Sequence, residues 1–256
     1  MVPPERWPTT LADAVSRCRL FNEVRVLAET ASTQDAAREL ASHSGLVVTA
    51  WRQTGGRGRL GRGWVDTGED GVAVTFIAPD ASPERLAVAS AVAVARTTAW
   101  LARSNTTVRV GIKWPNDVVV ARRKIAGILI ERTREVALIG VGLNAGQHSF
   151  EGELAKTATS LRLLGIEVDR CAVLERLILD LDAALAEDAE SLASAYAERD
   201  ALRGTHAVFG TPEGEVAGVV VRVSPFEGIV IVCDGVERCL ASATTTVSSW
   251  KDCSSR

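Results

Sequence analysis

The stretch TGGRGRLGRGW, residues 54–64, holds five glycines, three arginines and one tryptophan. It is too rich in glycine to form a stable helix, but its glycines allow positive φ angles and a close approach to a ligand. Successive amides in such a loop can form an anion-binding nest. Arg57, Arg59 and Arg62 add planar forks that bind a carboxylate or phosphate at two points, and Trp64 offers a flat face to a ring. These residues indicate a loop that folds over an anionic small molecule; the alternative from composition alone is a flexible, solvated basic loop.

A second polar motif, KWPND at residues 113–117, places a lysine, an amide and a carboxylate around a proline. Asn116 and Asp117 have the oxygen ligands that suit a magnesium ion, and they also suit the polar edge of a nucleotide. Lys113 adds a positive charge beside them. Taken alone, the Pro-Asn-Asp sequence is equally typical of a turn.

Two apolar segments carry further candidates. In KIAGIL, residues 124–129, Lys124 begins an apolar run, a setting that suits a carboxylate or acyl phosphate but also an ordinary lysine at a strand end. In GVGLN, residues 140–144, two glycines and Asn144 end another apolar run. A ligand can lie against such bare backbone, although a tight bend gives the same pattern.

The hydrophobic pattern predicts the elements that position these motifs. Apolar and β-branched runs predict strands at 23–29, 46–53, 71–80, 108–113, 117–121, 124–132 and 136–143. The short turn at Arg122 and Arg123 predicts an antiparallel hairpin. Helical spacing and caps predict a helix from Ser32 or Thr33 to Gly45, a buried helix after Ser82 and Pro83, and a long helical stretch over 169–201. Short strands separated by turns after Arg203 predict a small all-β barrel.

Composition narrows the class of protein. The chain has 256 residues, 24% of them charged, and a formal net charge of −3, which favours a small anion over a nucleic-acid duplex as the partner of the basic loop. No run of 18 apolar residues predicts a membrane span, and we expect no signal peptide. The five cysteines are scattered without a CxxC pair, so we expect reduced thiols in a cytoplasmic protein and no cysteine metal site.

These motifs in this order resemble the biotin protein ligases, also called biotin–[acetyl-CoA carboxylase] ligases, in a form without an N-terminal DNA-binding domain. The resemblance covers roughly residues 25–250. It rests on STQ (32–34), QTGGRGRLGRGW (53–64), IKWPND (112–117), KIAGILIE (124–131), GVGLN (140–144) and ATSL (158–161).

The resemblance implies an α+β fold with a mixed β-sheet flanked by helices, related to class II aminoacyl-tRNA synthetases. It implies a catalytic domain over residues 1–203 and an SH3-like β-barrel over residues 204–256. In the family's reaction, biotin and ATP with Mg²⁺ give biotinyl-5'-AMP and pyrophosphate. A lysine of a biotin carboxyl carrier domain then takes the biotinyl group and releases AMP. The loop and its cations would screen two anions and cover an intermediate that water hydrolyses.

The same resemblance assigns site residues. Implied biotin contacts are Ser32, Thr33, Gln53, Gly56, Arg57, Lys124, Gly140 and Gly142. Implied ATP or adenylate contacts are Arg59, Arg62, Trp64, Lys113, Asn116, Asp117 and Asn144, with Asp117 as the metal ligand. Lys124, Arg59 and Arg57 are the implied catalytic residues.

Two departures from the family pattern stand out. The family often reads Ser-Thr-Asn where this chain has Gln34, and we expect Gln34 to disturb the entry to the helix more than the chemistry. About 24 residues precede the first predicted strand, too few for the winged helix of the repressor members, so we expect an enzyme and not a repressor.

Three other functions remain as alternatives: a lipoate or octanoate ligase of related fold, a biotin-sensing DNA-binding regulator, and a non-catalytic biotin binder. We expect a monomer or weak homodimer, because an exposed strand edge near 136–143 can pair two subunits or stay free.

The glycine content of residues 55–64 predicts a loop that is mobile without ligand, since few contacts can hold five glycines. Biotin or the adenylate should order it. Hydrogen–deuterium exchange of this segment, measured with and without biotin, should show slower exchange in the complex, whereas equal protection in both states would contradict the prediction.

Overall fold

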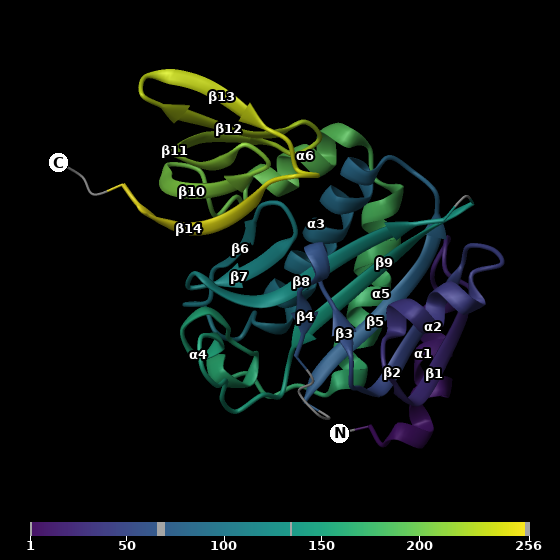
Figure 1. Ribbon diagram of the computed structural model, residues 1–256. Coiled ribbons are helices and arrows are strands. Elements are labelled where there is room, and N and C mark those ends of the chain that lie inside the picture. Colours follow the sequence, from purple (N-terminus) through teal and green to yellow (C-terminus); the bar gives the residue numbers. More distant parts are fainter. Residues whose placement is uncertain (1, 66–69, 134, 254–256) are drawn as a thin grey trace.

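The computed structural model describes residues 2–65, 70–133 and 135–253. Its centre is a seven-stranded sheet in the order β1-β2-β5-β9-β8-β7-β6 (Figure 1). The strands in that order are β1 (Glu23–Thr30), β2 (Leu46–Gln53), β5 (Gly71–Pro79), β9 (Val136–Asn144), β8 (Arg123–Arg132), β7 (Asp117–Val120) and β6 (Val110–Lys113). β1 and β2 are parallel and all other neighbours are antiparallel. The predicted mixed sheet and the hairpin of β7 and β8 are confirmed.

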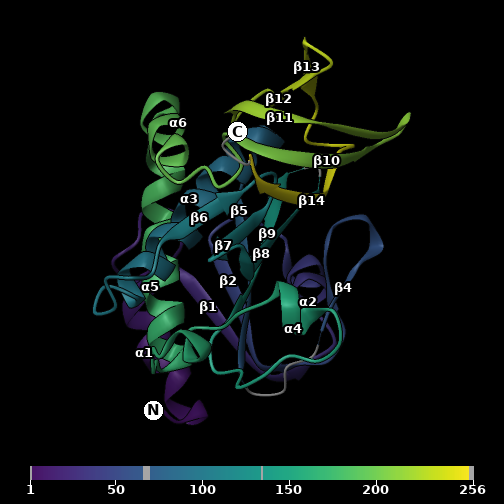
Figure 2. The same cartoon turned by 90° about the vertical axis from the view of Figure 1, so that its left-hand side faces the viewer.

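Helices cover the two faces of the sheet unequally. The large core lies between one face and the helices α1 (Trp7–Val15), α3 (Pro83–Leu101) and α5 (Arg170–Ala186), and a short η1 (Pro4–Arg6) precedes α1. On the opposite face, α2 (Thr33–Leu40) covers a smaller apolar cluster (Figure 2). Adjacent residues of β2 show the alternation, because Val47 points into the large core and Val48 into the cluster under α2. The rest of the second face is open to a ligand.

The predicted start of α3 is confirmed. Ser82 is its N-cap and accepts a hydrogen bond from the backbone N–H of Arg85 (3.2 Å), and Pro83 takes the first helical position. α3 is buried on most sides and packs against α5. No helix in the described part of the chain combines the length and the apolar character needed to cross a membrane.

The predicted helical stretch over 169–201 is present as two helices, because α5 ends at Ala186 and the chain resumes as α6 (Ala189–Ala197). The break has a local cause. The main-chain oxygen of Glu187 accepts a hydrogen bond from Arg85, and its carboxylate binds Arg96. Asp188 then caps α6 by accepting from the Ser191 N–H at 2.8 Å. The contacts of Glu187 with the two arginines and the new N-cap at Asp188 therefore replace the hydrogen bonds that a continuous helix would make here.

The expected free strand edge near residues 136–143 is also wrong. β9 lies in the interior of the sheet, paired along its length with β5 on one side and β8 on the other. It has no edge to offer a second subunit. At the β6 end of the sheet, the Ile112 N–H donates to the Arg199 carbonyl at 2.6 Å, so the segment after α6 covers part of that edge.

A five-stranded antiparallel sheet follows at the C-terminal end, in the order β13-β12-β11-β10-β14. Its strands are β10 (Thr205–Thr211), β11 (Gly214–Ser224), β12 (Gly228–Cys233), β13 (Val236–Leu240) and β14 (Thr246–Asp252). Register shifts in β10 and β11 mark bulges that bend the sheet. The expected small C-terminal β domain is present, and we propose residue 204 as its start.

Trp114 joins the two parts of the molecule. Its side chain is 2% exposed and packs with Phe209, Ile231 and other residues of the C-terminal core rather than with the large core. The motif that supplies Lys113 and Asp117 to the large sheet therefore inserts its own tryptophan into the second domain. The position of the C-terminal sheet is coupled in this way to the position of two candidate site residues.

Candidate active site

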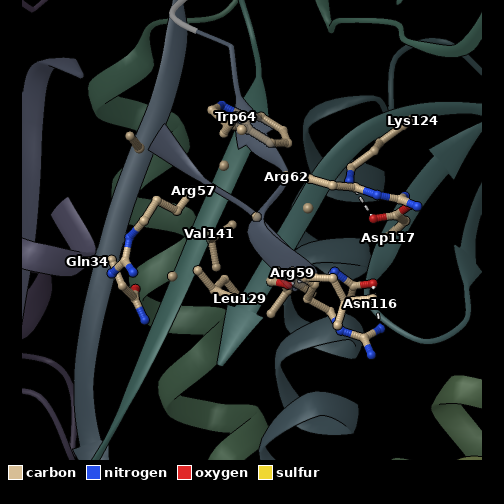
Figure 3. A pocket seen from close by; sticks show the side chains of 18 of the residues that line it. Gln34, Arg57, Arg59, Arg62, Trp64, Asn116, Asp117, Lys124, Leu129 and Val141 are labelled. Carbon is tan, nitrogen blue, oxygen red and sulfur yellow. Dashed lines mark hydrogen bonds and ion pairs between the residues drawn. The ribbon is translucent and has the colours of Figure 1, made fainter. Parts of the chain in front are cut away.

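The open face of the large sheet forms a cavity with most of the predicted site residues in its wall. All of those residues except Gly56 and Asn144 line it. They come from the start of α2, the end of β2, the β6–β7 turn, β8 and β9, and from the residues 54–64 that lie over the sheet (Figure 3). Thr246 and Val247 of β14 close one side, so the C-terminal domain contributes to the wall. Motifs spread over more than 100 residues of sequence thus meet in one place.

The Gly/Arg segment forms a small ribbon over this cavity. β3 (Gly56–Arg57) pairs with β4 (Gly63–Trp64), and the turn η2 (Arg59–Gly61) connects them. The expectation that its glycines supply positive φ holds only for Gly61, since the other positive φ in the turn belongs to Leu60. Gly56 instead permits close packing, because a Cβ there would lie 2.5 Å from Gln53 Nε2.

Four cations surround a single carboxylate beneath this ribbon. Asp117 Oδ1 lies 2.6 Å from Lys124 Nζ, and Asp117 Oδ2 lies 3.9 Å from Lys113 Nζ. Arg62 extends toward the same pair (Figure 3). Arg59 donates to Asn116 Oδ1 at 3.3 Å and to the main-chain oxygen of Ser242 at 2.6 Å. The ribbon is therefore fastened to the C-terminal domain, and the cluster keeps an excess of positive charge.

Burial and repulsion between like charges lower the pKa values of Lys113 and Arg59. Burial is the main cause that lowers the pKa of Lys113; the carboxylate of Asp117 opposes it, and Lys124 and Arg62 add to it. The pKa of Arg59 is lowered for the same leading reason, again opposed by Asp117. An anion that enters relieves this repulsion, so the site is prepared for negative charge.

Arg57 is oriented differently from the other arginines. Its guanidinium donates to Asp35 Oδ1 at 2.6 Å and to Glu131 Oε2 at 3.3 Å, and Glu131 also binds Arg38 at 2.6 Å. Arg57 lines the cavity, but its charge is balanced by two carboxylates. These contacts anchor one end of the ribbon to α2 and β8. A catalytic role for Arg57 remains a prediction.

One end of the cavity is polar because buried and half-buried side chains there form a chain of hydrogen bonds. Gln53 Oε1 accepts from the Thr33 N–H (2.9 Å) and lies 3.1 Å from the Thr33 hydroxyl. The chain continues through Thr75 to Gln34. The expectation that Gln34 disturbs the helix entry is wrong, because α2 begins at Thr33 with Ser32 as N-cap and the Gln34 side chain lines the cavity. Sequence reasoning missed Thr75 altogether; the one signal for Gln34 was its departure from Asn.

The middle of the cavity is walled by apolar side chains and bare backbone. Ile128, Leu129 and Val141 supply the apolar surface (Figure 3 labels Leu129 and Val141). The Trp64 indole lies on Gly142, where a Cβ would be 2.5 Å from its ring. The glycines of β9 therefore make room for side chains of this chain as well as for a ligand.

A second cavity adjoins the first and shares Gly63, Trp64, Lys113, Asp117 and Lys124 with it. Its further walls are Val65, Val119, Arg122, Asn144, Phe150, Leu154, Thr157, Ala158, Ser248, Ser249 and Trp250. Most of these lie in the loop that contains α4 (Leu154–Thr157), which precedes the short turn η3 (Arg162–Leu164), or in β14. Of these residues only Asn144 was assigned to a site from the sequence. Ala158 begins the ATSL motif but received no role, and β14 carries no distinctive motif.

Asn144 stands behind this second cavity. It is 5% exposed, and its Nδ2 donates to the main-chain oxygens of Thr159 at 3.0 Å and Lys124 at 3.5 Å. The backbone N–H of Thr159 donates back to the Lys124 carbonyl at 2.9 Å. Asn144 thus braces the backbone that carries Lys124.

The described side chains do not by themselves form a complete metal-binding site. Within residues 2–65, 70–133 and 135–253, no group of three His, Cys, Asp or Glu side chains is arranged to bind a metal ion. Asp117 can supply one carboxylate, which fits Mg²⁺ only when phosphate oxygens and water complete its six ligands.

Comparison with known proteins agrees with this geometry. Residues 25–147 match the Biotin/lipoate A/B protein ligase family. A bifunctional ligase/repressor BirA of Bacillus subtilis is 37% identical over 164 residues, which cover 58% of this chain and 49% of that protein. The chain therefore spans about half the length of this relative. The biotin–[acetyl-CoA-carboxylase] ligase of Mycobacterium tuberculosis is 34% identical over 214 residues, 78% of this chain and 79% of that protein.

The fold has a solved counterpart. The biotin protein ligase of Aquifex aeolicus in complex with biotin and ATP superimposes with a TM-score of 0.80 at 25% identity, over 89% of this chain and 99% of that one.

The lowered pKa of Lys113 has a measurable consequence for stability. Between the folded pKa and the ordinary lysine value, the unfolded chain binds more protons, so the free energy of unfolding rises with pH through that window. The Lys113→Met variant should lack this rise. Urea unfolding from pH 7 to 10.5 measures it, with Lys251→Met as the exposed control. Identical pH slopes for the wild type and Lys113→Met would contradict the burial of this charge.

Proposed function

Since this chain belongs to the biotin protein ligase family, we propose that it activates biotin with ATP as biotinyl-5'-AMP and transfers the biotinyl group to a lysine of a biotin carboxyl carrier domain. The observation that carries the proposal is the position of the cationic cluster at the junction of two cavities. A reaction between two anionic substrates needs positive charge where they meet.

The first cavity suits biotin. Its polar end offers Ser32, Thr33 and Gln53 to the ureido ring, and its apolar middle accepts the thiophane ring and the aliphatic chain. The carboxylate then reaches the shared cations, where Lys124 is available to bind it. Lys124 is paired with Asp117 in the structure, and exchange of that partner for the substrate carboxylate keeps its charge balanced throughout.

The second cavity suits the nucleotide. Phe150, Leu154 and Trp250 give it an apolar and aromatic lining for a base. The wall that it shares with the first cavity includes Lys113, Asp117 and Lys124. Mg²⁺ fits here as an ion that ATP brings with it; phosphate oxygens would hold it together with Asp117, the one carboxylate among the described residues that line the two cavities. When bound, it would neutralise phosphate charge.

In the first step, a biotin carboxylate oxygen forms a bond to the α-phosphorus, and pyrophosphate leaves with the electron pair of the broken P–O bond. Lys124, Lys113, Arg59 and Arg62 stabilise the charge that develops there. In the second step, the carrier lysine amine attacks the acyl carbon, loses a proton, and AMP leaves. The ribbon, closed by Arg59 on Ser242, shields the anhydride from water between the steps.

A mass-spectrometric assay tests this proposal. We expect a carrier domain of acetyl-CoA carboxylase or a related carboxylase to gain one biotinyl mass increment on one lysine when incubated with this protein, biotin, ATP and Mg²⁺. Omission of ATP and replacement of the acceptor lysine by arginine are the controls. Lipoate or octanoate transfer in place of biotin would overturn the proposal in favour of a lipoate-type ligase. We propose a cytoplasmic location, where the carrier substrates are made.

Arg59 is expected to retain the adenylate. Arg59→Gly removes the hydrogen bonds to Asn116 and Ser242, so biotinyl-5'-AMP should escape and label lysines of bystander proteins. Biotin incorporated into serum albumin, relative to the carrier domain, measures the escape. Arg109→Gly, at an exposed arginine outside both cavities, is the matched control. If Arg59→Gly holds the intermediate as long as the wild type does, Arg59 has no guarding role.

Lys124 is expected to act mainly in the transition state, because it touches the reacting carboxylate. Loss of one preorganised donor typically costs about 100- to 1000-fold in rate. Lys124→Ala should slow adenylate formation by roughly that factor, with a smaller loss of biotin affinity. Lys124→Arg should rescue it incompletely, since a planar fork does not replace a compact charge.

Single-turnover measurement of pyrophosphate release separates adenylate formation from transfer. Lys156→Ala, at a lysine whose side chain is 77% exposed, controls for the loss of a lysine. Rates for Lys124→Ala within a few-fold of wild type would remove Lys124 from the catalytic residues.

A further inference from the structure

One edge of the large sheet is free to pair. β1 is the first strand in the sheet, and among residues 2–65, 70–133 and 135–253 its one partner is β2 (Figure 1). The opposite edge, β6, is partly covered by the segment after α6, because the Ile112 N–H donates to the Arg199 carbonyl. The main-chain groups on the outer side of β1 can therefore form a ladder with another strand.

The side chains of β1 show which strand could lie there. Val24 and Val26 pack against the large core, on the side of α1. Leu27 packs against the cluster under α2, and Arg25 and Glu29 share its face because side chains alternate along a strand. The side chains of Arg25 and Glu29 are 54% and 59% exposed. Charges on an edge strand disfavour a partner with the same sign opposite them and favour the opposite sign.

A second copy of β1 can pair with the first in few registers. In an antiparallel pair, hydrogen-bonded and non-hydrogen-bonded residue pairs alternate along the strands. A two-fold axis must convert each pair into one of the same kind, so it passes where a residue lies opposite itself. For a strand from Glu23 to Thr30, the two registers with the longest overlap are therefore centred on Val26 and on Leu27.

These two registers differ in charge. The register centred on Val26 places Glu23 opposite Glu29 twice, and like charges directly opposite each other destabilise a sheet. The register centred on Leu27 places Arg25 opposite Glu29 twice, one pair on each side of the axis. The two Leu27 side chains face each other between these pairs, and the residues opposed on the other face carry no charge. β1 is thus self-complementary in one of its two longest registers.

The free edge of the C-terminal sheet lacks this property. β13 is the outer strand of that sheet, and all its residues except Leu240 are exposed. Its full-length two-fold register is centred on Arg238 and places that arginine opposite itself, which disfavours the pair. Exposure alone therefore does not make a strand self-complementary.

We propose that this protein forms a homodimer in which two copies of β1 pair antiparallel in the register centred on Leu27 and join the two large sheets into one. Each Arg25 then makes an ion pair with Glu29 of the other copy. Within one chain, Arg25 binds Glu23 at 2.9 Å and Glu29 lies 3.4 Å from Arg52, and such exposed pairs contribute little by themselves. The inference does not depend on the function proposed above.

The expected dimer is weak and reversible. A single pair of strands is smaller than the interface of about 1,200–2,000 Å² that a stable complex buries. Sedimentation equilibrium from low micromolar to millimolar protein measures its dissociation constant. Hydrogen–deuterium exchange provides a second measurement, since the outward amides of residues 24–30 should exchange more slowly at high than at low protein concentration.

Charge reversal tests both the dimer and its register. Arg25→Glu creates two contacts between carboxylates, and Glu29→Arg creates two contacts between guanidinium groups. Each variant alone should therefore associate at least about tenfold more weakly than wild type. Mixed in equal amounts, the two variants should form a heterodimer with a dissociation constant within about threefold of the wild-type value, because every reversed charge then faces the opposite sign.

Glu23→Arg is the matched control. It removes the ion pair that Arg25 makes within its own chain, but residue 23 lies outside the overlap of the proposed register. The dissociation constant of this variant should stay within about threefold of wild type. Thermal unfolding of each variant checks that the charge reversals leave the monomer folded.

Several results would overturn the inference. A chain that stays monomeric at all concentrations has no such dimer, and a dimer unaffected by either reversal is held by another surface. Variants that dissociate alone but do not associate when mixed would show that Arg25 and Glu29 are not opposite each other. If the wild type is monomeric and the β1 amides become protected only with a carrier domain, the edge binds that partner instead of a second copy.

Discussion

The structure depends on holding several positive charges together in a half-buried place. Asp117 lies among Lys113, Lys124, Arg59 and Arg62, and within the described parts of the chain it is the one carboxylate in contact with this cluster. Such a cluster opposes folding through repulsion and desolvation. Its cations are carried by three parts of the fold, with Lys113 on β6, Lys124 on β8, and Arg59 and Arg62 on the ribbon. An anion that binds where the two cavities meet reduces this repulsion, so its binding is favourable there. The remaining positive charge would be neutralised by bound anions rather than by protein carboxylates. This gives a physical reason for binding two anions at once.

Contacts from both domains hold the cationic cluster in place. Trp114, between Lys113 and Asn116 in sequence, is buried in the C-terminal core. Arg59 reaches the Ser242 carbonyl, and Arg122 stacks on Trp250 with its guanidinium carbon 4.1 Å from the ring centroid. Arg122 occupies the turn that precedes Lys124, so the C-terminal sheet fixes both the ribbon above the site and the hairpin below it. A disturbance of the second domain is therefore transmitted to the cationic cluster.

The opposite end of the first cavity has a different physical character. There the wall is neutral. The buried side chains of Gln34, Thr33 and Thr75 and the half-buried amide of Gln53 fix one another's orientation through hydrogen bonds. Charge in the centre attracts any suitable anion, whereas hydrogen-bond complementarity distinguishes one ring from another. Arg57 belongs to the glycine-rich motif but lies outside the cationic cluster. It makes ion pairs with Asp35 and Glu131 and in this way positions the ribbon.

The sequence by itself determined the elements and the identity of most cavity residues. Local signals sufficed for α3, which Ser82 and Pro83 begin, and for the β7–β8 hairpin, because caps, turns and periodicity act over a few residues. Only the tertiary structure decided long-range partners. The break at Glu187 needed Arg85 and Arg96 from another helix, and the burial of β9 followed from strand order, which the strand pattern does not encode. The orientation of the Gln34 amide depends on hydrogen bonds with Leu138 and Thr75, which lie 104 and 41 residues away in sequence. Hydrogen-bond complementarity between such distant groups exists only once the chain has folded.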